Sequence, residues 1–425
     1  MTDVLTRLMT LPTRIRVGVI GIGNIGKGLV YQLGITPGME CVAIADINLP
    51  SAIAWAQRLG RDFVVVESLD RMCDSIRAGK LAVCADGLLV AACQYVDVLL
   101  DSTSAIEGGL NFASTAIAHH KHVVMMNSEA DLVFGPHLAS LAFNEDVVYT
   151  SADGDQHTVM KRLINEIELW GFRTVLAGNM KGFLDRYVTP DSIAPEADKR
   201  FMDHQMCSSY SDGTKMNIEN ALLANAIGAR VAIPGMLGPK VHNIYDAIDF
   251  FELDSIWNGN TPLVDYTLGS YPPGGVFVIG FNDQPHQVET LSWYPPRLGE
   301  APFYLFHRPY HLGHIEAMAC IAEAFLDHWP VLSPEYGFMT NVYAYAKRDL
   351  HLGEILDGIG GFCAYGLIEN VDQYSPNQGL PICLADHVTL RRDIPRDEKI
   401  LMTDVVFDSN DIRFPVFQSQ LDFEE

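Results

Sequence analysis

The chain has 425 residues, of which 48% are hydrophobic and 19% are charged, and this balance excludes a disordered, collagen-like or coiled-coil protein. The 53 acidic side chains outnumber the 29 Lys and Arg side chains and give a net charge of −24, which repels nucleic-acid phosphates and anionic lipids. We therefore expect a small-molecule substrate as partner, with no nucleic acid and no membrane. The eight cysteines form no CxxC pair and several lie in apolar runs, which indicates reduced core thiols in a cytoplasmic protein.

The first part of the chain alternates short apolar runs with helical patterns. Strands are expected within 14–23, 40–47, 96–103, 121–128 and 147–152, and helices after residue 23, from about Ser51 and over about 108–119. Such alternation is typical of parallel βαβ units, and strands that are apolar throughout fit a sheet covered on both faces. We predict an α/β fold that begins with a Rossmann-type, doubly wound sheet over residues 1–152.

The pattern changes after this sheet. Helical patterns at 157–170, 215–228 and 314–328 mix with apolar strands at 275–281 and 301–306. These elements predict a central α+β domain over residues 153–340. Short strands and turns then predict a small β-rich domain over residues 341–425.

A glycine-rich motif, GIGNIG, closes the first predicted strand and opens a helix. In a dinucleotide-binding turn Gly21 would make the tight bend, Gly23 would let the backbone approach the pyrophosphate, and Gly26 would allow close helix–strand packing. Asp46 ends the second strand and would accept hydrogen bonds from the adenosine ribose, which favours NAD over NADP. The expected cofactor-binding residues at this turn are Gly21, Gly23, Asn24, Ile25, Gly26 and Asp46. The alternatives are a glycine turn without a nucleotide and a solvated acid at a strand end.

Polar side chains follow the strand at 96–103, and ligands of such sheets bind beyond the carboxyl ends of the strands. Ser102 and Thr103 are therefore candidates for contacts to the nicotinamide, or alternatively caps of the next helix. His119, His120 and His122 resemble a metal cluster. A position at the C-terminal end of a helix, where imidazoles interact favourably with the helix dipole, explains them better.

The second domain holds the candidates for chemistry. Asp212 lies just before a helical run. Lys215, at the start of this run, and Glu219 share one face of the helix. A lysine beside two acids could protonate a carbonyl oxygen as hydride arrives at the carbon, so these three residues are the expected catalytic group. The alternative is a surface salt bridge at a helix start.

Substrate contacts are expected from two loops and one junction. Asp155 and Lys181 lie in glycine-bracketed polar segments that suit substrate contact, or alternatively are plain turns. Arg308 and His311 belong to the junction HRPYH, which could bind an anionic group or simply pack a strand against a helix.

The chain resembles the homoserine dehydrogenase superfamily, and most closely its 1-deoxy-D-xylulose 5-phosphate reductoisomerase-like (DRL-type) oxidoreductases. The segments that carry the resemblance are VGVIGIGNIGKGL, KHVVMMNSEAD, SADGDQ, SDGTKMNIENALLANAIG, PGGVFVIGF, APFYLFHRPYHLGHIEA and AKRDLHLGEILDGIGGF. The tail at 380–407 is also similar to a SAF (β-clip) domain. The resemblance implies an NAD(P)-dependent enzyme with a Rossmann domain, a central catalytic and dimerisation domain, and a C-terminal β-rich module.

We expect hydride transfer between NAD, or NADP, and a small polar hydroxy or keto compound such as a polyol, a sugar derivative or a phosphorylated compound. A reductoisomerase that uses NADPH and a divalent metal is an alternative, and its metal ligands would come from Asp153, Asp155, Asp212 and Glu219. Another alternative is a catalytically inactive NAD-binding sensor. The chain is expected to form a homo-oligomer, such as a homodimer.

Overall fold

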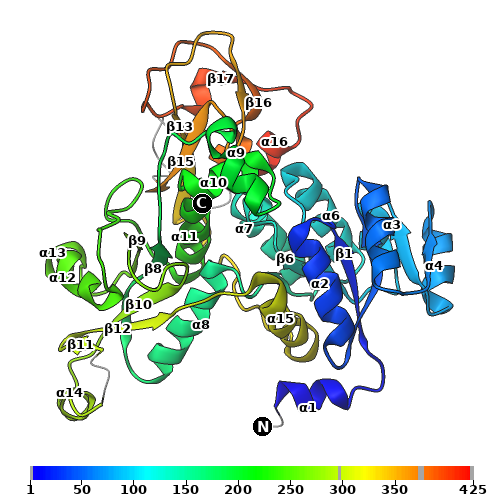
Figure 1. Ribbon diagram of the computed structural model, residues 1–425, viewed down its shortest axis with the longest axis horizontal. Helices are drawn as coiled ribbons and strands as arrows, with labels where there is room; N and C mark the ends of the chain where they lie inside the picture. The colour runs from blue at the N-terminus through cyan, green and yellow to red at the C-terminus, as the bar shows by residue number, and fades with distance from the viewer. Residues whose placement is uncertain (1–2, 295–297, 372–377, 422–425) are drawn as a thin grey trace. The chain divides into compact units, whose positions relative to one another are not determined.

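The computed structural model describes residues 3–294, 298–371 and 378–421 (Figure 1). The chain folds into two compact units. The first contains residues 1–155 and 312–333, and the second contains residues 156–311 and 334–425. The division of the chain into three domains at residues 152 and 340 stays a prediction.

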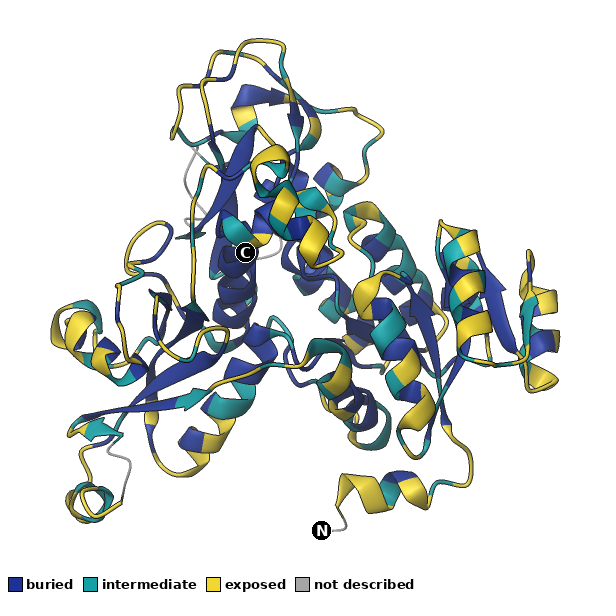
Figure 2. Cartoon of the chain, in the orientation of Figure 1, coloured by how far each residue is buried: buried dark blue, intermediate teal, exposed yellow. Residues whose placement is uncertain are grey.

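The first unit is built on a seven-stranded parallel sheet with the order β3-β4-β2-β1-β5-β6-β7. Its strands are β1 (Ile15–Ile20), β2 (Met39–Ala45), β3 (Phe63–Val65), β4 (Leu81–Cys84), β5 (Val98–Asp101), β6 (His122–Met125) and β7 (Tyr149–Ser151). All but β3 are almost fully buried, and Figure 2 shows them in the buried colour. This parallel sheet confirms the predicted α/β fold class.

One helix precedes β1, and further helices follow the strands of this sheet in the order that βαβ units require. They are α1 (Val4–Met9), α2 (Asn24–Ile35), α3 (Leu49–Arg58), α4 (Leu69–Arg77), α5 (Gly87–Ala92), α6 (Ile106–Ala118), α7 (Ser128–Asn144) and α15 (Gly313–Asp327). α15 comes from a distant part of the chain and packs against α2 and β6. The segment after it also joins the sheet region, since Ser151 N donates to Leu332 O at 2.9 Å.

The second unit contains a mixed five-stranded sheet with the order β11-β12-β10-β8-β9. Its strands are β8 (Arg173–Lys181), β9 (Leu263–Leu268), β10 (Val276–Phe281), β11 (Gly299–Glu300) and β12 (Phe303–Arg308). α8 (Gln156–Leu169) packs on β8 and β10, and α11 (Thr214–Ile227) contacts α8, β8 and β9. α11 is buried along almost its whole length, and left-handed glycines stand at its two ends, Gly213 with φ 90° and Gly228 with φ 69°.

The rest of the second unit consists of short helices and two small sheets. The helices are α9 (Pro190–Lys199), α10 (His204–Ser211), α12 (Ala247–Phe250), α13 (Leu253–Ile256), α14 (Pro285–Leu291) and α16 (Arg413–Leu421), with 3₁₀ turns at Ile244–Asp246, Ile382–Leu384 and Met402–Asp404. β13 (Thr340–Ala346) pairs with β15 (Ala364–Asn370), and β14 (Ile355–Asp357), β16 (Asp386–Leu390) and β17 (Val405–Val406) form the other sheet. These strands agree with the predicted β-rich C-terminal region, whose similarity to a SAF domain stays a prediction.

One sequence-based expectation is wrong. The segment Gly178–Gly182 does not form a polar loop, because Gly178 to Lys181 are the last residues of strand β8. They pair with β9, and Gly178 and Asn179 also pair with β10. Glycine and asparagine usually mark turns, but here a side chain at Gly178 would come within 2.2 Å of Asp265 O. Glycine is therefore needed for the close approach of the neighbouring strand.

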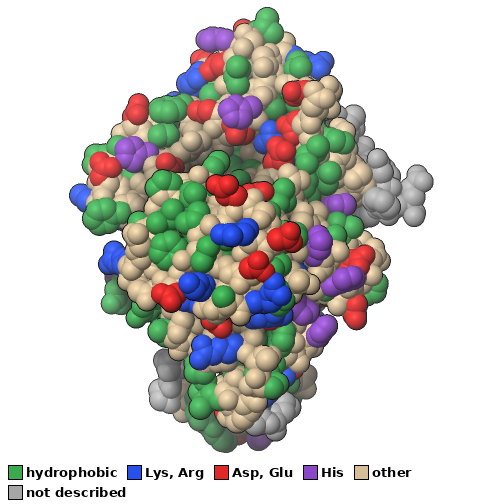
Figure 3. Space-filling model, turned by 90° about the vertical axis from the view of Figure 1, so that its right-hand side faces the viewer, with side chains coloured by type: hydrophobic (Ala, Val, Ile, Leu, Met, Phe, Trp, Pro, Cys, Tyr) green, Lys and Arg blue, Asp and Glu red, His purple; other side chains and the backbone are tan. Residues whose placement is uncertain are grey.

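Across the described residues, no helix is both long and apolar enough to cross a membrane. On the face drawn in Figure 3, acidic and basic side chains are interspersed. The eight cysteines all carry free thiols.

Candidate functional site

The glycine turn after β1 is shaped by two close backbone approaches. Gly21 adopts a left-handed conformation with φ 88°, and a Cβ atom there would lie 2.8 Å from the backbone of Ser102. A Cβ at Gly26 would lie 1.8 Å from Gly21 O. Only glycine fits these two positions, so the first turn of α2 can pack directly against the end of β1.

Gly23 has a different environment. It is the N-cap residue of α2, and a Cβ at this position would meet no atom within 4 Å. Asn24 and Ile25 form the first turn of α2, whose backbone N–H groups point out of the helix N-terminus. Open space in front of a helix N-terminus is the arrangement that binds the pyrophosphate of a dinucleotide.

Asp46 lies directly after β2 and is partly exposed. Its Oδ2 accepts the N–H of Ile22 at 2.6 Å, and its Oδ1 accepts the N–H of Asn48 at 2.7 Å. The carboxylate therefore ties the glycine turn to the start of the next helix. Each oxygen has a second lone pair, which leaves Asp46 able to accept a hydroxyl as well.

Ser102 and Thr103 are bound to their own surroundings. Ser102 Oγ lies 2.7 Å from Gly21 O, so its hydroxyl braces the glycine turn. Thr103 Oγ1 accepts from Asn127 Nδ2 at 3.2 Å, and its backbone N–H donates to Asp101 Oδ1 at 2.9 Å. Burial raises the pKa of Asp101 to about 6. Their contact with a nicotinamide stays a prediction.

The three histidines are explained by secondary structure. His119 ends α6, His120 follows it with φ 54°, and His122 begins β6. His122 Nδ1 accepts the N–H of Val148 at 3.0 Å, and burial lowers its pKa to about 4. Within the described residues, no group of three or more His, Cys, Asp or Glu side chains is arranged to hold a metal ion.

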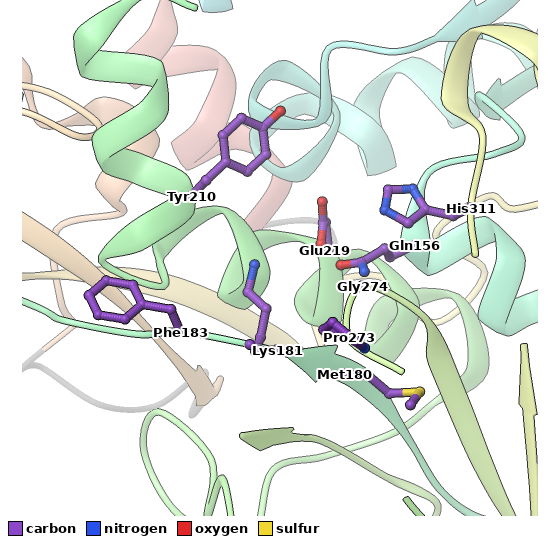
Figure 4. Close-up of a pocket in the computed structure, with 10 residues that line it drawn as sticks. Gln156, Met180, Lys181, Phe183, Tyr210, Glu219, Pro273, Gly274 and His311 are labelled. Carbon is purple, nitrogen blue, oxygen red and sulfur yellow. The ribbon is translucent and has the colours of Figure 1, made fainter. Parts of the chain in front are cut away.

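The second unit contains a pocket of about 370 Å³ (Figure 4). It is lined by Gln156, Met180, Lys181, Gly182, Phe183, Tyr210, Glu219, Pro273, Gly274 and His311. The polar members come from the start of α8, the end of β8, α10, α11 and the segment after β12. Three residues predicted from the sequence, Lys181, Glu219 and His311, are thus brought together at one cavity.

Lys181 and Glu219 are the two charged groups of this lining. Figure 4 shows the Lys181 amine and the Glu219 carboxylate pointing the same way, toward the space below Tyr210. Desolvation lowers the pKa of Lys181 from its usual 10.5, while the negative charges of Glu219 and Asp212 act in the opposite direction. A lysine in this setting releases its proton more readily than a surface lysine.

Glu219 is held in place by buried amides. Asn179 Nδ2 donates to Glu219 Oε2 at 3.1 Å and also to Gln156 Oε1. Asn220 Nδ2 in turn donates to Asn179 Oδ1 at 2.5 Å. All four side chains are at most 6% exposed. The network fixes the carboxylate and one wall of the pocket, since amides held on both sides cannot rotate freely.

Asp212 has another partner than the one expected. Its Oδ2 lies 2.9 Å from Lys347 Nζ, and both side chains are almost completely buried. Lys347 also donates to Val188 O and Gly361 O, each at 2.8 Å. Asp212 therefore anchors the junction of α10 and α11, and burial raises its pKa from the usual 3.8. A direct role for it beside Lys215 stays a prediction.

Lys215 is buried, with 7% of its surface exposed, and it is not among the residues that line the pocket. Its charge, together with that of His311 and above all burial, lowers the pKa of His157 to about 3. His157 therefore stays neutral between two other basic groups. The alternative of Lys215 as a surface ion pair is ruled out by its burial, and its catalytic role stays a prediction.

Arg308 and Asp155 lie outside the lining of the pocket. Arg308 ends β12, and its guanidinium lies over the ring of Tyr310 at 4.6 Å. Asp155 belongs to the first unit. Their expected contacts with substrate stay predictions.

Sequence reasoning missed Gln156, Tyr210 and Lys347. Gln156 is the first residue of α8 and directly follows the predicted Asp155, so its place at a strand–helix junction was a usable signal. Tyr210 precedes the predicted Asp212 by two residues, but nothing in the pattern separates it from other exposed tyrosines. Lys347 is 135 residues from its partner, and no local pattern identifies such a pair.

Residues 154–317 match the family described as the catalytic domain of oxidoreductase DRL. This segment contains Lys181, Lys215, Glu219 and His311. No curated protein is significantly similar to the chain.

Several solved structures are distantly similar. A probable dehydrogenase from Thermotoga maritima is 13% identical, with 76% of this chain and 92% of that chain covered and a TM-score of 0.46. A homoserine dehydrogenase from Thiobacillus denitrificans is 14% identical, with coverages of 84% and 90% and a TM-score of 0.45. A myo-inositol dehydrogenase from Corynebacterium glutamicum is 10% identical, with coverages of 74% and 89% and a TM-score of 0.42.

The family match confirms the resemblance expected from the sequence over the part of the chain that holds the pocket. This chain is therefore an oxidoreductase whose residues 154–317 are similar to the DRL catalytic domain.

Proposed function

We propose that this chain transfers hydride between NAD(H) and a small polar hydroxy or keto compound that binds in the pocket of the second unit. The observation that carries the proposal is Lys181, an amine with a lowered pKa in a pocket that also holds a fixed carboxylate. Oxidation of an alcohol needs a group that takes the hydroxyl proton as the hydride leaves, and reduction needs a group that returns it.

The glycine turn of the first unit supports a dinucleotide as cofactor. Gly23 leaves open space before the N-terminus of α2, where the pyrophosphate would bind. Asp46 would accept a ribose hydroxyl and would repel the additional phosphate of NADP. When bound, the cofactor supplies or accepts the hydride.

The chain's own residues would then handle the substrate oxygen and its proton. Lys181 Nζ would take the proton of the substrate hydroxyl in oxidation and give it back to the carbonyl oxygen in reduction. Glu219 would stabilise the protonated amine, and it is itself fixed by Asn179. Gln156 and His311 would orient further hydroxyl or carbonyl groups, which suits a polyol or sugar derivative.

Steady-state kinetics with a panel of polyols, sugars and sugar acids tests the proposal. We expect Lys181→Met to lower kcat by about 10²–10⁴-fold, the usual contribution of a general acid–base group, with the dissociation constant of NADH unchanged. Lys215→Met tests the other candidate for the proton role, because Lys215 is also a buried lysine of this domain. If Lys215→Met abolishes turnover and Lys181→Met does not, the proton role belongs to Lys215.

Product analysis separates the remaining alternatives. A rearranged carbon skeleton and dependence on a divalent metal would identify a reductoisomerase. NADH binding without turnover of any compound in the panel would favour a sensor and contradict the proposal.

A further inference from the structure

Two thiols of the first unit lie in contact. Cys73 is in the middle of α4, Cys93 directly follows α5, and their Sγ atoms are 3.8 Å apart. The sulfurs of a disulfide are about 2.05 Å apart, so these are two free thiols that need to approach by less than 2 Å to form a bond. α4 is short and its outer face is exposed.

The two thiols differ in access. Cys73 is partly exposed, whereas Cys93 is completely buried. Burial raises the pKa of Cys93 to about 11. An oxidant dissolved in water would therefore reach Cys73 first, and Cys93 would be the second thiol to react.

Basic side chains surround this pair. Lys121 is within electrostatic range of both thiols, Arg77 is within range of Cys73, and Arg16 is within range of Cys93. Arg16 and Arg77 are also paired with Asp97 and Asp74. Lys121 is itself buried, with 3% exposure, so its effect on a nearby thiolate is weakly screened by solvent.

The pair lies away from the glycine turn. Arg16 is at the start of β1 and Lys121 directly precedes β6, so the cluster marks the amino ends of these parallel strands. The glycine turn follows the carboxyl end of β1. A reaction at the thiols would therefore occur at the amino ends of the strands, whereas the candidate cofactor site lies at their carboxyl ends.

From the contact and the difference in access, we propose that Cys73 and Cys93 form a reversible oxidation site that closes to a disulfide. With hydrogen peroxide as oxidant, the Cys73 thiolate attacks one peroxide oxygen, which gives a sulfenic acid and, after protonation of the departing hydroxide, water. The Cys93 thiolate then attacks the Cys73 sulfur and releases a second hydroxide, which is protonated to water. The two thiols lose two electrons in total, the peroxide gains them, and a dithiol reductant reverses the reaction.

Mass spectrometry of the full chain tests this site. The purified protein is treated with hydrogen peroxide, quenched and alkylated under denaturing conditions with N-ethylmaleimide, and digested with trypsin. We expect two thiols fewer to be alkylated, and a linked pair of the peptides 72–77 and 81–121 that disappears after treatment with dithiothreitol. Peptide 81–121 also contains Cys84, so Cys84→Ser is the matched control, and it should keep the linkage.

Cys73→Ser and Cys93→Ser should each abolish the linked peptides. The disulfide would close a loop of about 20 residues, so the oxidised chain should also melt roughly 2–8 °C higher than the reduced chain. Irreversible oxidation of Cys73 to sulfinic or sulfonic acid without linkage would overturn the proposal. Loss of the linkage in Cys84→Ser, or a chain whose eight thiols are all alkylated after oxidation, would overturn it as well.

Discussion

Asp46 is a residue whose hydrogen bonds bear on cofactor choice. Its two carboxylate oxygens accept backbone N–H groups on both sides of the candidate ribose site. We predict that the chain binds NADH at least about tenfold more tightly than NADPH, since the loss of a ribose hydrogen bond together with phosphate repulsion should exceed about 1.4 kcal/mol.

Fluorescence titration with both cofactors measures this ratio. Asp46→Asn keeps one acceptor oxygen but removes the charge, so it should bring the two affinities closer together. Equal affinities in the parent chain would show that Asp46 only holds the glycine turn.

The coupling of Glu219 to Lys181 predicts a change in pH dependence. In alcohol oxidation the free amine is the active form, so the rate should rise with pH through the pKa of Lys181, which lies below 10.5. The negative charge of Glu219 raises this pKa. Glu219→Gln should therefore move the rising part of the profile to lower pH, whatever its effect on the maximal rate.

The profile of kcat/KM against pH gives the position of this rise. Asp249→Asn removes an exposed acid elsewhere in the second unit and should leave the profile in place. An unchanged profile in Glu219→Gln would mean that Lys181 is not the group that titrates.

At the scale of elements, two glycines at the junction of β1 and α2 have different roles: Gly23 leaves space for a ligand, and Gly26 allows close packing. Gly23→Ala adds a methyl group into open space, so the free energy of unfolding should change by at most about 1 kcal/mol. The same methyl group occupies the candidate pyrophosphate site and should raise the dissociation constant of NADH tenfold or more. Gly26→Ala, by contrast, should destabilise the unit itself, because its Cβ would overlap Gly21 O.

Thermal unfolding and NADH titration of the two variants provide the measurement. Loss of stability in Gly23→Ala equal to that in Gly26→Ala would show that the open space is needed for folding rather than for a ligand.

The Asp212–Lys347 pair joins the start of α11 to the end of β13. Both groups are buried, and removal of one partner leaves an uncompensated charge in the interior. We predict that Lys347→Met lowers the free energy of unfolding by about 3–5 kcal/mol. The double variant with Asp212→Asn should recover part of this loss, and urea unfolding measures both. A single variant as stable as the parent chain would show that the pair is solvated.

Elements with a clear pattern of apolar and polar residues were predictable from the sequence, and elements without such a pattern were not. The strands β1, β2, β5, β6 and β7 match apolar runs bounded by polar residues. The run from Leu81 to Leu100 conceals β4 and α5, because a buried strand and a short buried helix are equally apolar. Strand β3 has only three residues, and its sequence shows too little of a pattern to be detected.

The candidate site was predictable where a side chain was unusual for its surroundings. Lys181 was recognisable in a glycine-bracketed segment, Glu219 on a helix face and His311 in the junction HRPYH, and all three line the pocket. Asn179, Asn220 and Lys347 act through hydrogen bonds and ion pairs between distant segments, which strand pairing and helix packing determine. Such pairings follow from the tertiary fold and not from local spacing.

At the scale of the whole molecule, the net charge of −24 opposes the approach of any anion. NADH carries two negative phosphates, and dissolved salt screens the long-range repulsion between them and the protein. We predict that the association rate constant of NADH increases by about twofold or more when the salt concentration is raised from about 20 to 200 mM. Stopped-flow fluorescence measures this rate, and a decrease with salt would indicate a local positive funnel that outweighs the net charge.

The return of residues 312–333 to the first unit has a consequence for synthesis. The ribosome completes residue 155 long before residue 333, and at about 5–20 residues per second the interval is roughly 10–35 s. During this time α2 lacks α15, and Thr150 and Ser151 lack their partners at Val331 and Leu332. The nascent chain therefore cannot finish its units strictly one after the other, and the sheet that emerges first must wait, incompletely covered, until most of the second unit has been made.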